Sequence, residues 1–121
     1  MKESNLLGHW GEATAAAYLR RRGYEILACN FRSRFGEIDL IARKKNYVVF
    51  CEVKTRKDAS FAQAMEFVDR RKQRRLRDTA AIWLAQNDGP WLSRFDVIEV
   101  YAPEGVQTRK PKIRQIEDAF E

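Results

Sequence analysis

The sequence has little of what zinc proteins and membrane proteins depend on. Its 121 residues include two cysteines, Cys29 and Cys51, and a single histidine, His9. No Cys-x-x-Cys or Cys/His spacing occurs, which argues against a zinc site, and both cysteines are expected to be buried reduced thiols. No apolar run reaches the roughly 18 residues of a membrane helix, and residues 1–8 lack the apolar core of a signal peptide. We therefore expect a soluble protein without a membrane partner and with a cytoplasmic location.

Acidic residues are the minority in a chain of otherwise ordinary composition. Apolar residues make up 45% of the sequence and charged residues 33%, which is typical of a globular protein. The length suits one domain that covers residues 1–121. Lys and Arg number 23 against 17 Asp and Glu, for a net charge of +6. A polyanionic partner would suit this charge, although many proteins without such a partner share it.

The stretch from residue 35 to residue 56 organises the rest of the chain. Two β-rich apolar runs, Ile38–Ala42 and Tyr47–Val53, flank the polar residues 44–46, and this pattern predicts a β-hairpin. Because successive side chains of a strand point to opposite faces, Glu52 and Lys54 share one face of the second strand. The other face is fully apolar and expected to be buried, with Val49, Cys51 and Val53.

The register of this hairpin decides which charged residues meet. A two-residue loop at residues 45–46 would place Asp39 opposite Glu52, and Glu37 opposite Lys54. Directly opposed side chains have Cβ atoms about 4.5–5.5 Å apart, so two carboxylates would be destabilising unless a proton, a cation or a lysine neutralised them. A hard divalent ion bound through oxygen would do so. A one-residue slip would instead move Asp39 to the other face.

Helices and further strands are predicted on both sides of the hairpin. One helix is expected over Leu6–Arg22, capped by Ser4 or Asn5, and another over Arg70–Gln86, capped by Asp69. The other expected elements are a strand inside the sheet, a loop with a short helical turn, a further strand, an edge strand and a tail: Tyr24–Asn30, Phe61–Val68, Arg94–Tyr101, Lys112–Ile116 and Glu117–Glu121. This order predicts an α/β sandwich around a mixed sheet.

Two features of the predicted helices bear on function. Glu12 lies one turn before Ala16 and two before Leu19, so it is either a solvated glutamate on the helix flank or a carboxylate directed at the sheet. The buried stripe of this helix is expected to consist of Leu6, Trp10, Ala13 and Ala17. The second helix begins R-R-K-Q-R-R-L-R, with six basic residues in eight. Positive charge opposes the macrodipole at a helix N-terminus, so this cluster either contacts phosphate or forms a solvated face.

The charged residues of the hairpin suit metal-dependent hydrolysis of a phosphodiester. Asp39 and Glu52 would hold Mg²⁺ or Mn²⁺, and Lys54 would position the attacking water or balance charge on the phosphate. Glu12 would complete the metal shell or hold a second ion if the first helix packs over the sheet. Glu37 is a candidate accessory carboxylate. The residues expected to contact phosphates of DNA or another nucleic acid are Arg32, Arg34, Arg56, Arg71, Lys72, Arg74 and Arg75.

Six segments, taken in order, resemble one bacterial family. They are Gly11–Ala15 (G-E-x-x-A), Arg32–Ala42 (R-x-x-x-G-E-I-D-L-I-A), Phe50–Arg56 (F-C-E-V-K-T-R), Val68–Leu76 (V-D-x-R-K-Q-R-R-L), Arg94–Val97 (R-F-D-V) and Ile116–Phe120 (I-E-D-A-F). This set spans nearly the whole chain. It is similar to the YraN-like family, which is assigned to the PD-(D/E)XK nuclease superfamily and resembles archaeal Holliday junction resolvases.

The resemblance implies a fold and a function. The fold is a restriction-endonuclease-like three-layer sandwich, with a mixed central β-sheet flanked by helices. Asp39, Glu52 and Lys54 map onto the catalytic core of the superfamily, with Ile38 in place of its proline, and Glu12 maps onto a helical acidic residue of resolvase-like members. The implied function is a divalent-metal-dependent endonuclease acting on DNA, with branched DNA suggested by the resolvases alone. Those relatives work as dimers, which makes a homodimer one expectation.

Two alternatives to an enzyme stay open. The first is a nuclease fold that holds nucleic acid or a protein partner without cutting, although a pure phosphate binder gains nothing from opposed carboxylates. The second is a simple salt bridge from Lys54 to Glu37 or Glu52 on a solvated face. Such a bridge is worth about 0–1 kcal/mol and leaves Asp39 unexplained. The enzyme is therefore the interpretation that we favour, and the non-catalytic binding module is the second choice.

Overall fold

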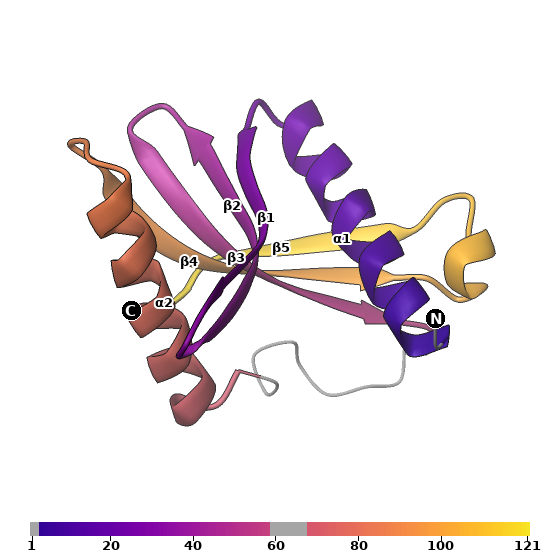
Figure 1. Ribbon diagram of the computed structural model, residues 1–121. Helices are drawn as coiled ribbons and strands as arrows, with labels where there is room; N and C mark the ends of the chain where they lie inside the picture. Colours follow the sequence, from indigo (N-terminus) through magenta and orange to yellow (C-terminus); the bar gives the residue numbers. More distant parts are fainter. Residues whose placement is uncertain (1–2, 59–67) are drawn as a thin grey trace.

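A helix opens the chain and is followed by three strands, a second helix and two further strands (Figure 1). The computed structural model describes residues 3–58 and 68–121, so most of the helical turn expected at Phe61–Val68 lies outside the described residues. The elements are α1 (Glu3–Arg21), β1 (Glu25–Ser33), β2 (Gly36–Lys44), β3 (Tyr47–Arg56), α2 (Arg70–Gln86), β4 (Leu92–Tyr101), the short 3-10 helix η2 (Gly105–Gln107) and β5 (Lys112–Phe120). Among these residues no helix is both long and apolar enough to cross a membrane.

The five strands form one mixed sheet in the order β1-β2-β3-β4-β5. The pairs β1–β2, β2–β3 and β4–β5 are antiparallel, while β3 and β4 run parallel. A parallel pair needs a long crossover connection, and α2 lies within it. The mixed α/β sheet predicted from the sequence is therefore confirmed.

The strand β1 lies at an edge of the sheet, which corrects the expectation that it would lie inside. The expectation rested on apolar residues on both of its faces. Those residues are accounted for by the helices, because Leu27 packs into the core beneath α2 while Ile26 packs into the core beneath α1. One further expectation fails here, since the thiol of Cys29 is exposed and only that of Cys51 is buried.

Each face of the sheet carries its own hydrophobic core. Beneath α2, the helix residues Leu76 and Trp83 pack with Phe50 of β3, whose ring meets that of Trp83 edge to face at 5.9 Å between centroids. Beneath α1, Leu19 packs with Val49 and other apolar side chains of β2, β3 and β4. Figure 1 shows the two helices on opposite sides of the sheet. The structure thus has three layers, with one helix on each face.

The second helix has its predicted bounds, whereas the last strand is longer than predicted. Helix α2 spans Arg70–Gln86 as predicted, and the side chain of Asp69 caps it by accepting a hydrogen bond of 2.9 Å from the backbone N–H of Lys72. The last strand continues to Phe120, where a tail was expected. It extends because Phe120 pairs with Phe95 of β4 and stacks on its ring.

The buried stripe of α1 differs from the predicted one. Ala15, Ala16 and Leu19 are the buried residues, whereas Leu6 is 48% exposed and Ala13 is also exposed. The helix also includes Ser4 and Asn5, which were predicted to precede it as caps. Since Ala16 and Leu19 are buried, the face that Glu12 shares with them is the one directed at the sheet.

A close approach between α1 and β3 brings Glu12 over the sheet. A Cβ atom added to Gly11 would lie 1.7 Å from the Oγ1 atom of Thr55 in β3, far inside any real contact. Only glycine therefore allows this helix to approach β3 so closely at this point. Because Glu12 and Lys54 are the chain neighbours of the two residues that touch, the contact draws both toward the same end of the sheet.

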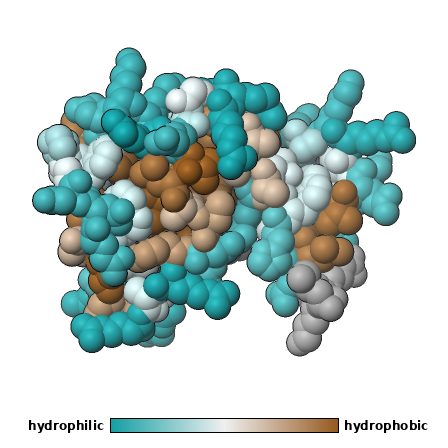
Figure 2. Space-filling view, turned by 45° about the horizontal axis from the view of Figure 1, so that its top comes forward, coloured by the Kyte–Doolittle hydropathy of each residue, from teal (hydrophilic) through white to brown (hydrophobic). Residues whose placement is uncertain are grey.

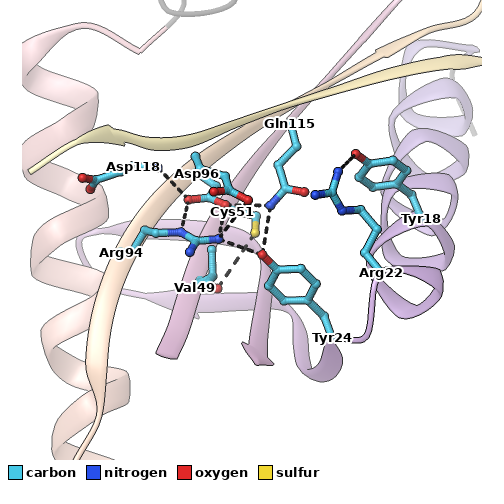
Figure 3. A network of polar contacts seen from close by, with 10 residues as sticks. Tyr18, Arg22, Tyr24, Val49, Cys51, Arg94, Asp96, Gln115 and Asp118 are labelled. Atoms are coloured by element: carbon cyan, nitrogen blue, oxygen red, sulfur yellow. Dashed lines mark hydrogen bonds and ion pairs between the residues drawn. The ribbon is translucent and has the colours of Figure 1, made fainter. Parts of the chain in front are cut away.

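A buried polar network ties the end of β4 to β5 and to the start of β1 (Figure 3). Asp96, 1% exposed, accepts hydrogen bonds from Arg94 at 2.8 and 3.0 Å, from the Gln115 amide at 2.8 Å and from the Asp118 backbone N–H at 3.0 Å. Arg94 also donates to the Tyr24 hydroxyl at 2.8 Å. The R-F-D-V segment thus has a structural role, in which the Asp96 carboxylate joins β4 to β5 and Arg94 links both to Tyr24, the residue before β1.

Hydrophilic side chains cover most of the surface seen in Figure 2, around a central hydrophobic area and a smaller one on the right. This distribution matches a chain in which a third of the residues are charged. Of the exposed large apolar side chains among the described residues, Tyr47 and Leu92 are neighbours on β3 and β4, Leu6 and Val106 line one hollow, and Phe35 stands apart from both pairs in the sequence.

The contact at Gly11 gives a testable prediction with an internal control. Gly11→Ala should lower the free energy of unfolding by about 1–3 kcal/mol, because the new methyl group must push α1 away from Thr55. Gly8→Ala, in the same helix, meets nothing within 4 Å and should raise it by up to about 1 kcal/mol through helix propensity. Urea unfolding followed by circular dichroism measures both. Equal effects of the two substitutions would show that the close approach is not required.

Candidate active site

The strands β2 and β3 separate at the position where the two acidic residues were predicted to face each other. Their pairing has the predicted register from Lys44↔Tyr47 to Leu40↔Cys51, with a two-residue loop at residues 45–46, and the described ladder ends there. Neither the predicted pair of Asp39 with Glu52 nor that of Glu37 with Lys54 is part of this ladder. The opening leaves space between the strands for side chains.

The carboxyl group of Asp39 occupies this opening. Its Oδ2 atom accepts a hydrogen bond of 2.8 Å from the backbone N–H of Val53, a donor beyond the end of the β2–β3 ladder. Asp39 therefore lies beside Glu52, the residue that precedes Val53. The two carboxyl groups are thus close together, as predicted, although not as a directly opposed pair of the ladder.

Burial and neighbouring charge raise the pKa of Asp39 to about 8. Removal from water is the largest cause, the negative charge of Glu52 comes next, and the charge of Glu12 adds to both. The hydrogen bond from Val53 works in the opposite direction and is outweighed. In the absence of a metal ion, Asp39 thus favours its protonated form at neutral pH.

Two lysines approach the second carboxylate, Glu52, which is only 6% exposed. The Lys72 ammonium, from the first turn of α2, donates a hydrogen bond to Glu52 Oε1. The Lys54 Nζ atom, from β3, lies 3.8 Å from the same oxygen. A buried carboxylate is therefore neutralised from the hairpin and from the helix that packs against it.

The two lysines differ in how the site affects their charge. Burial lowers the pKa of Lys54, and the nearby ammonium of Lys72 lowers it further. Burial also acts against the charge of Lys72, but its hydrogen bond to Glu52 and the charge of Glu52 outweigh that effect and raise its pKa. Lys72 is thus the more firmly charged partner of Glu52.

A cavity of about 480 Å³ opens in front of Asp39, Glu52 and Lys72, whereas Lys54 does not line it. Asp39 and Glu52 line one side, and the start of α2 lines the other with Arg71, Lys72 and Arg75. Gly36, Glu37, Asp69 and Leu76 complete the lining. Acidic groups from the strands therefore face basic groups from the helix across one open space.

Glu12 and Glu37 are linked to each other beside the cavity. The Asn30 amide, with its nitrogen directed at the carboxylates, donates to Glu12 Oε1 at 3.1 Å and to Glu37 Oε1 at 2.8 Å. Arg32 Nε donates to the other oxygen of Glu37 at 3.2 Å. Glu12 does not line the cavity itself, but its charge reaches Asp39.

The residues predicted to contact phosphate divide into two groups. Arg71, Lys72 and Arg75 line the cavity, and Arg32 is held at its edge through Glu37. Arg34 and Arg74 are exposed, and neither lines the cavity. Arg56 lies half-buried along β3, with its Nε atom 3.5 Å from Glu99 Oε2 of β4, so it is part of the sheet rather than of the cavity.

The donor set suits a hard divalent cation that keeps part of its hydration shell. Within the described residues, no three His, Cys, Asp or Glu side chains form a group that could hold a metal ion. Asp39 and Glu52 both line the cavity, and Glu12 does not line it, so the role of Glu12 as a further ligand stays a prediction. Mg²⁺ is commonly held by one or two carboxylates, with water and substrate phosphates as its other ligands, and the open cavity leaves room for them.

Two contributions to the site were missed in the sequence. Lys72 was assigned to phosphate binding alone, yet it lies one helical turn before Leu76, at the start of the stripe Leu76, Ala80 and Trp83 that packs on the sheet. That spacing was visible and indicates a lysine directed at the hairpin. Asn30 gave no comparable signal, because its position depends on a left-handed backbone conformation (φ 54°) within β1.

Comparison with known proteins places this arrangement in one family. The fold and cavity define an α/β protein with a carboxylate–lysine site, and residues 11–100 match the model of a family described as "Uncharacterised protein family UPF0102". The chain belongs to this UPF0102 family. It is 43% identical to a UPF0102 protein of Nocardia farcinica over 119 residues (98% of this chain and 91% of the relative). It is 44% identical to one of Caldanaerobacter subterraneus subsp. tengcongensis over 124 residues (99% and 100%).

The raised pKa of Asp39 predicts how stability depends on pH when no metal is present. The folded pKa of about 8 exceeds the ordinary value of 3.8, so the folded state binds a proton more tightly than the unfolded state. The contribution of Asp39 is thus fully present below about pH 4 and is lost as pH rises toward 8, by up to about 1.4 kcal/mol for each pH unit. In EDTA, Asp39→Asn should therefore gain stability over the wild type across this range.

The exposed Asp78→Asn on α2 is the matched control for Asp39→Asn, since it removes the same charge outside the cavity. Urea unfolding at several pH values between 4 and 8 measures the difference from the wild type for each variant. We expect this difference to grow with pH for Asp39→Asn and to stay flat for Asp78→Asn. A stability of Asp39→Asn that falls below the wild type at pH 8 would contradict the account of the carboxyl pair.

Proposed function

We propose that this protein is a divalent-metal-dependent nuclease that hydrolyses phosphodiester bonds in DNA. The observation that carries the proposal is the proximity of Asp39 and Glu52 in the wall of a cavity whose opposite side is basic. Lys54 Nζ lies 3.8 Å from Glu52 Oε1, although Lys54 does not line the cavity. Carboxylates that are close together and withdrawn from water destabilise the metal-free protein. A bound cation would offset this cost, and the same cation would attract a polyanionic substrate.

Several features of the fold also support the proposal of a nuclease. We place the chain in the PD-(D/E)XK superfamily, with a restriction-endonuclease-like sandwich as its architecture. The support is a mixed sheet with one helix on each face, an antiparallel hairpin whose strands separate, and an acidic residue on each strand at that opening. The E-x-K spacing of Glu52 and Lys54 follows on β3, as the superfamily pattern requires.

In the proposed mechanism, Asp39 and Glu52 hold Mg²⁺ or Mn²⁺. When bound, the ion would polarise the scissile phosphate and lower the pKa of a coordinated water. Lys54, whose pKa is lowered by burial and whose Nζ atom lies 3.8 Å from Glu52 Oε1, would orient that water or stabilise charge on the phosphate. Arg71 and Arg75 contact phosphates from the helix side of the cavity, where they give affinity without reading sequence. Glu12, fixed by Asn30, acts on the site through its charge.

A binding module that does not cut is the second candidate, and one observation favours it. Glu52 is already neutralised by Lys72 and Lys54, so the described structure is electrostatically balanced at this carboxylate without a metal. In that case the cavity would bind nucleic acid phosphates through α2 alone. This candidate leaves the proximity of Asp39 to Glu52 without a purpose, which is why we rank it second.

Cleavage of a labelled nucleic acid panel tests the proposal. The panel contains duplex, single strand, flap and four-way junction, each incubated with Mg²⁺, Mn²⁺ or EDTA. We expect cutting that requires the metal and that is lost in Lys54→Ala and in Asp39→Ala, with DNA affinity nearly unchanged in both. The product pattern would also identify the substrate class, which the cavity alone does not select.

Two control variants show whether the cleavage comes from this protein and not from a contaminant, and whether its loss is specific to the site. Asp78→Ala, purified in the same way, removes an exposed carboxylate outside the cavity and should cut like the wild type. Activity that survives in Lys54→Ala would point to a contaminating nuclease. Binding of the panel by wild type and variants, with no cutting in any metal, would establish the binding module instead.

A further inference from the structure

We propose that the Lys72 ammonium serves as the resident cation of the metal-free site, competing with the divalent ion for Glu52 and freed by that ion to bind a substrate phosphate. The inference rests on the proposed function and adds regulation to the same site. It is carried by the position of Lys72, whose ammonium donates directly to the Oε1 atom of Glu52. This oxygen is one of the few anionic ligands that the cavity offers to a cation.

The geometry distinguishes the roles of the two lysines. Lys54 is anchored on the strand that carries Glu52 and approaches Oε1 only to 3.8 Å, beyond hydrogen-bond length. Lys72 comes from a different layer and makes the direct hydrogen bond. A divalent ion bound at Oε1 would repel the ammonium that donates to the same oxygen and would compete with it for the negative charge of Glu52. We expect the lysine that bonds to Oε1 directly, Lys72, to withdraw.

The position of Lys72 on α2 would let its displaced ammonium bind a phosphate in the cavity. Lys72 lines the same cavity as Arg71 and Arg75, and its side chain is 34% exposed, so its ammonium needs no repacking of the core to turn toward the open space. Lys72 also follows the capping residue Asp69 closely, in the first turn of the helix. The start of α2 would thus gain one cation for phosphate when the metal binds. Metal and nucleic acid would each increase the affinity for the other.

Calorimetric titration with MnCl₂ in the absence of nucleic acid tests the competition. Lys72→Met removes the competing ammonium while keeping an apolar stem of similar length, and we expect it to bind Mn²⁺ about tenfold more tightly than the wild type. Arg75→Met is the matched control, because it removes the same charge from the same side of the cavity without a contact to Glu52 among the described interactions. It should change the Mn²⁺ affinity much less.

A second variant protects the test against loss of folding. Lys72→Gln stays neutral but keeps a hydrogen-bond donor for Glu52, so it should fold even if Lys72→Met does not, and it should also bind Mn²⁺ more tightly than the wild type. Equal changes in Lys72→Gln and Arg75→Met, or no change in either, would overturn the inference, because long-range charge would then explain the result.

The effect on nucleic acid binding is the second readout. With Ca²⁺ in place of Mg²⁺, Lys72→Met should lose more DNA affinity than it loses in EDTA, whereas the loss in Arg75→Met should be the same in both. Equal losses of Lys72→Met in both conditions would contradict the release of Lys72. These outcomes are separate from the nuclease proposal, since a protein that binds Mn²⁺ as expected but never cuts would refute the nuclease and leave the competition intact.

Discussion

One hydrogen bond defines the arrangement on which the site depends, from the Val53 backbone N–H to the Asp39 carboxyl group. It forms where β2 and β3 leave their regular pairing after Leu40 and Cys51. In a continuous ladder the backbone of β2 would lie across this space. Because the strands separate, a carboxyl group enters it and comes to rest beside Glu52. The two acidic side chains are thus brought together by the course of the backbone and not by the identity of the side chains alone.

The rest of the fold serves to stabilise and surround this opening. The helix α1 reaches it because Gly11 permits contact with Thr55, and Glu12 then adds negative charge from above the sheet. The helix α2 approaches from the other face and supplies Lys72 to neutralise Glu52. On β4, Asp96 pairs with Cys51, the neighbour of Glu52, and binds Gln115 of β5, while Arg94 reaches the Tyr24 hydroxyl. These interactions hold the sheet beside the acidic pair.

Much of this could be predicted from the sequence, and the failures have physical causes. The helix α2 and the hairpin register were predicted correctly, since Asp69 is a strong cap and a two-residue loop leaves one register. The separation of the strands was not, because alternation along a strand says nothing about where pairing stops. The stripe of α1 was misplaced, since alanines carry too little hydrophobicity to identify the buried face. The contact between Lys72 and Glu52 was missed because it joins residues of two different layers. The spacing of Lys72 from Leu76 along the helix did indicate that Lys72 faces the sheet.

The central claim is that Asp39 and Glu52 form a cation site from which Lys72 must withdraw. Diffraction from crystals grown with Mn²⁺, with data collected for anomalous scattering, tests it most directly. The account predicts an anomalous peak contacted by oxygens of both Asp39 and Glu52, with the Lys72 ammonium no longer bonded to Glu52. A structure in which Lys72 keeps its bond to Glu52 at saturating Mn²⁺, with no peak between the two carboxylates, would contradict it.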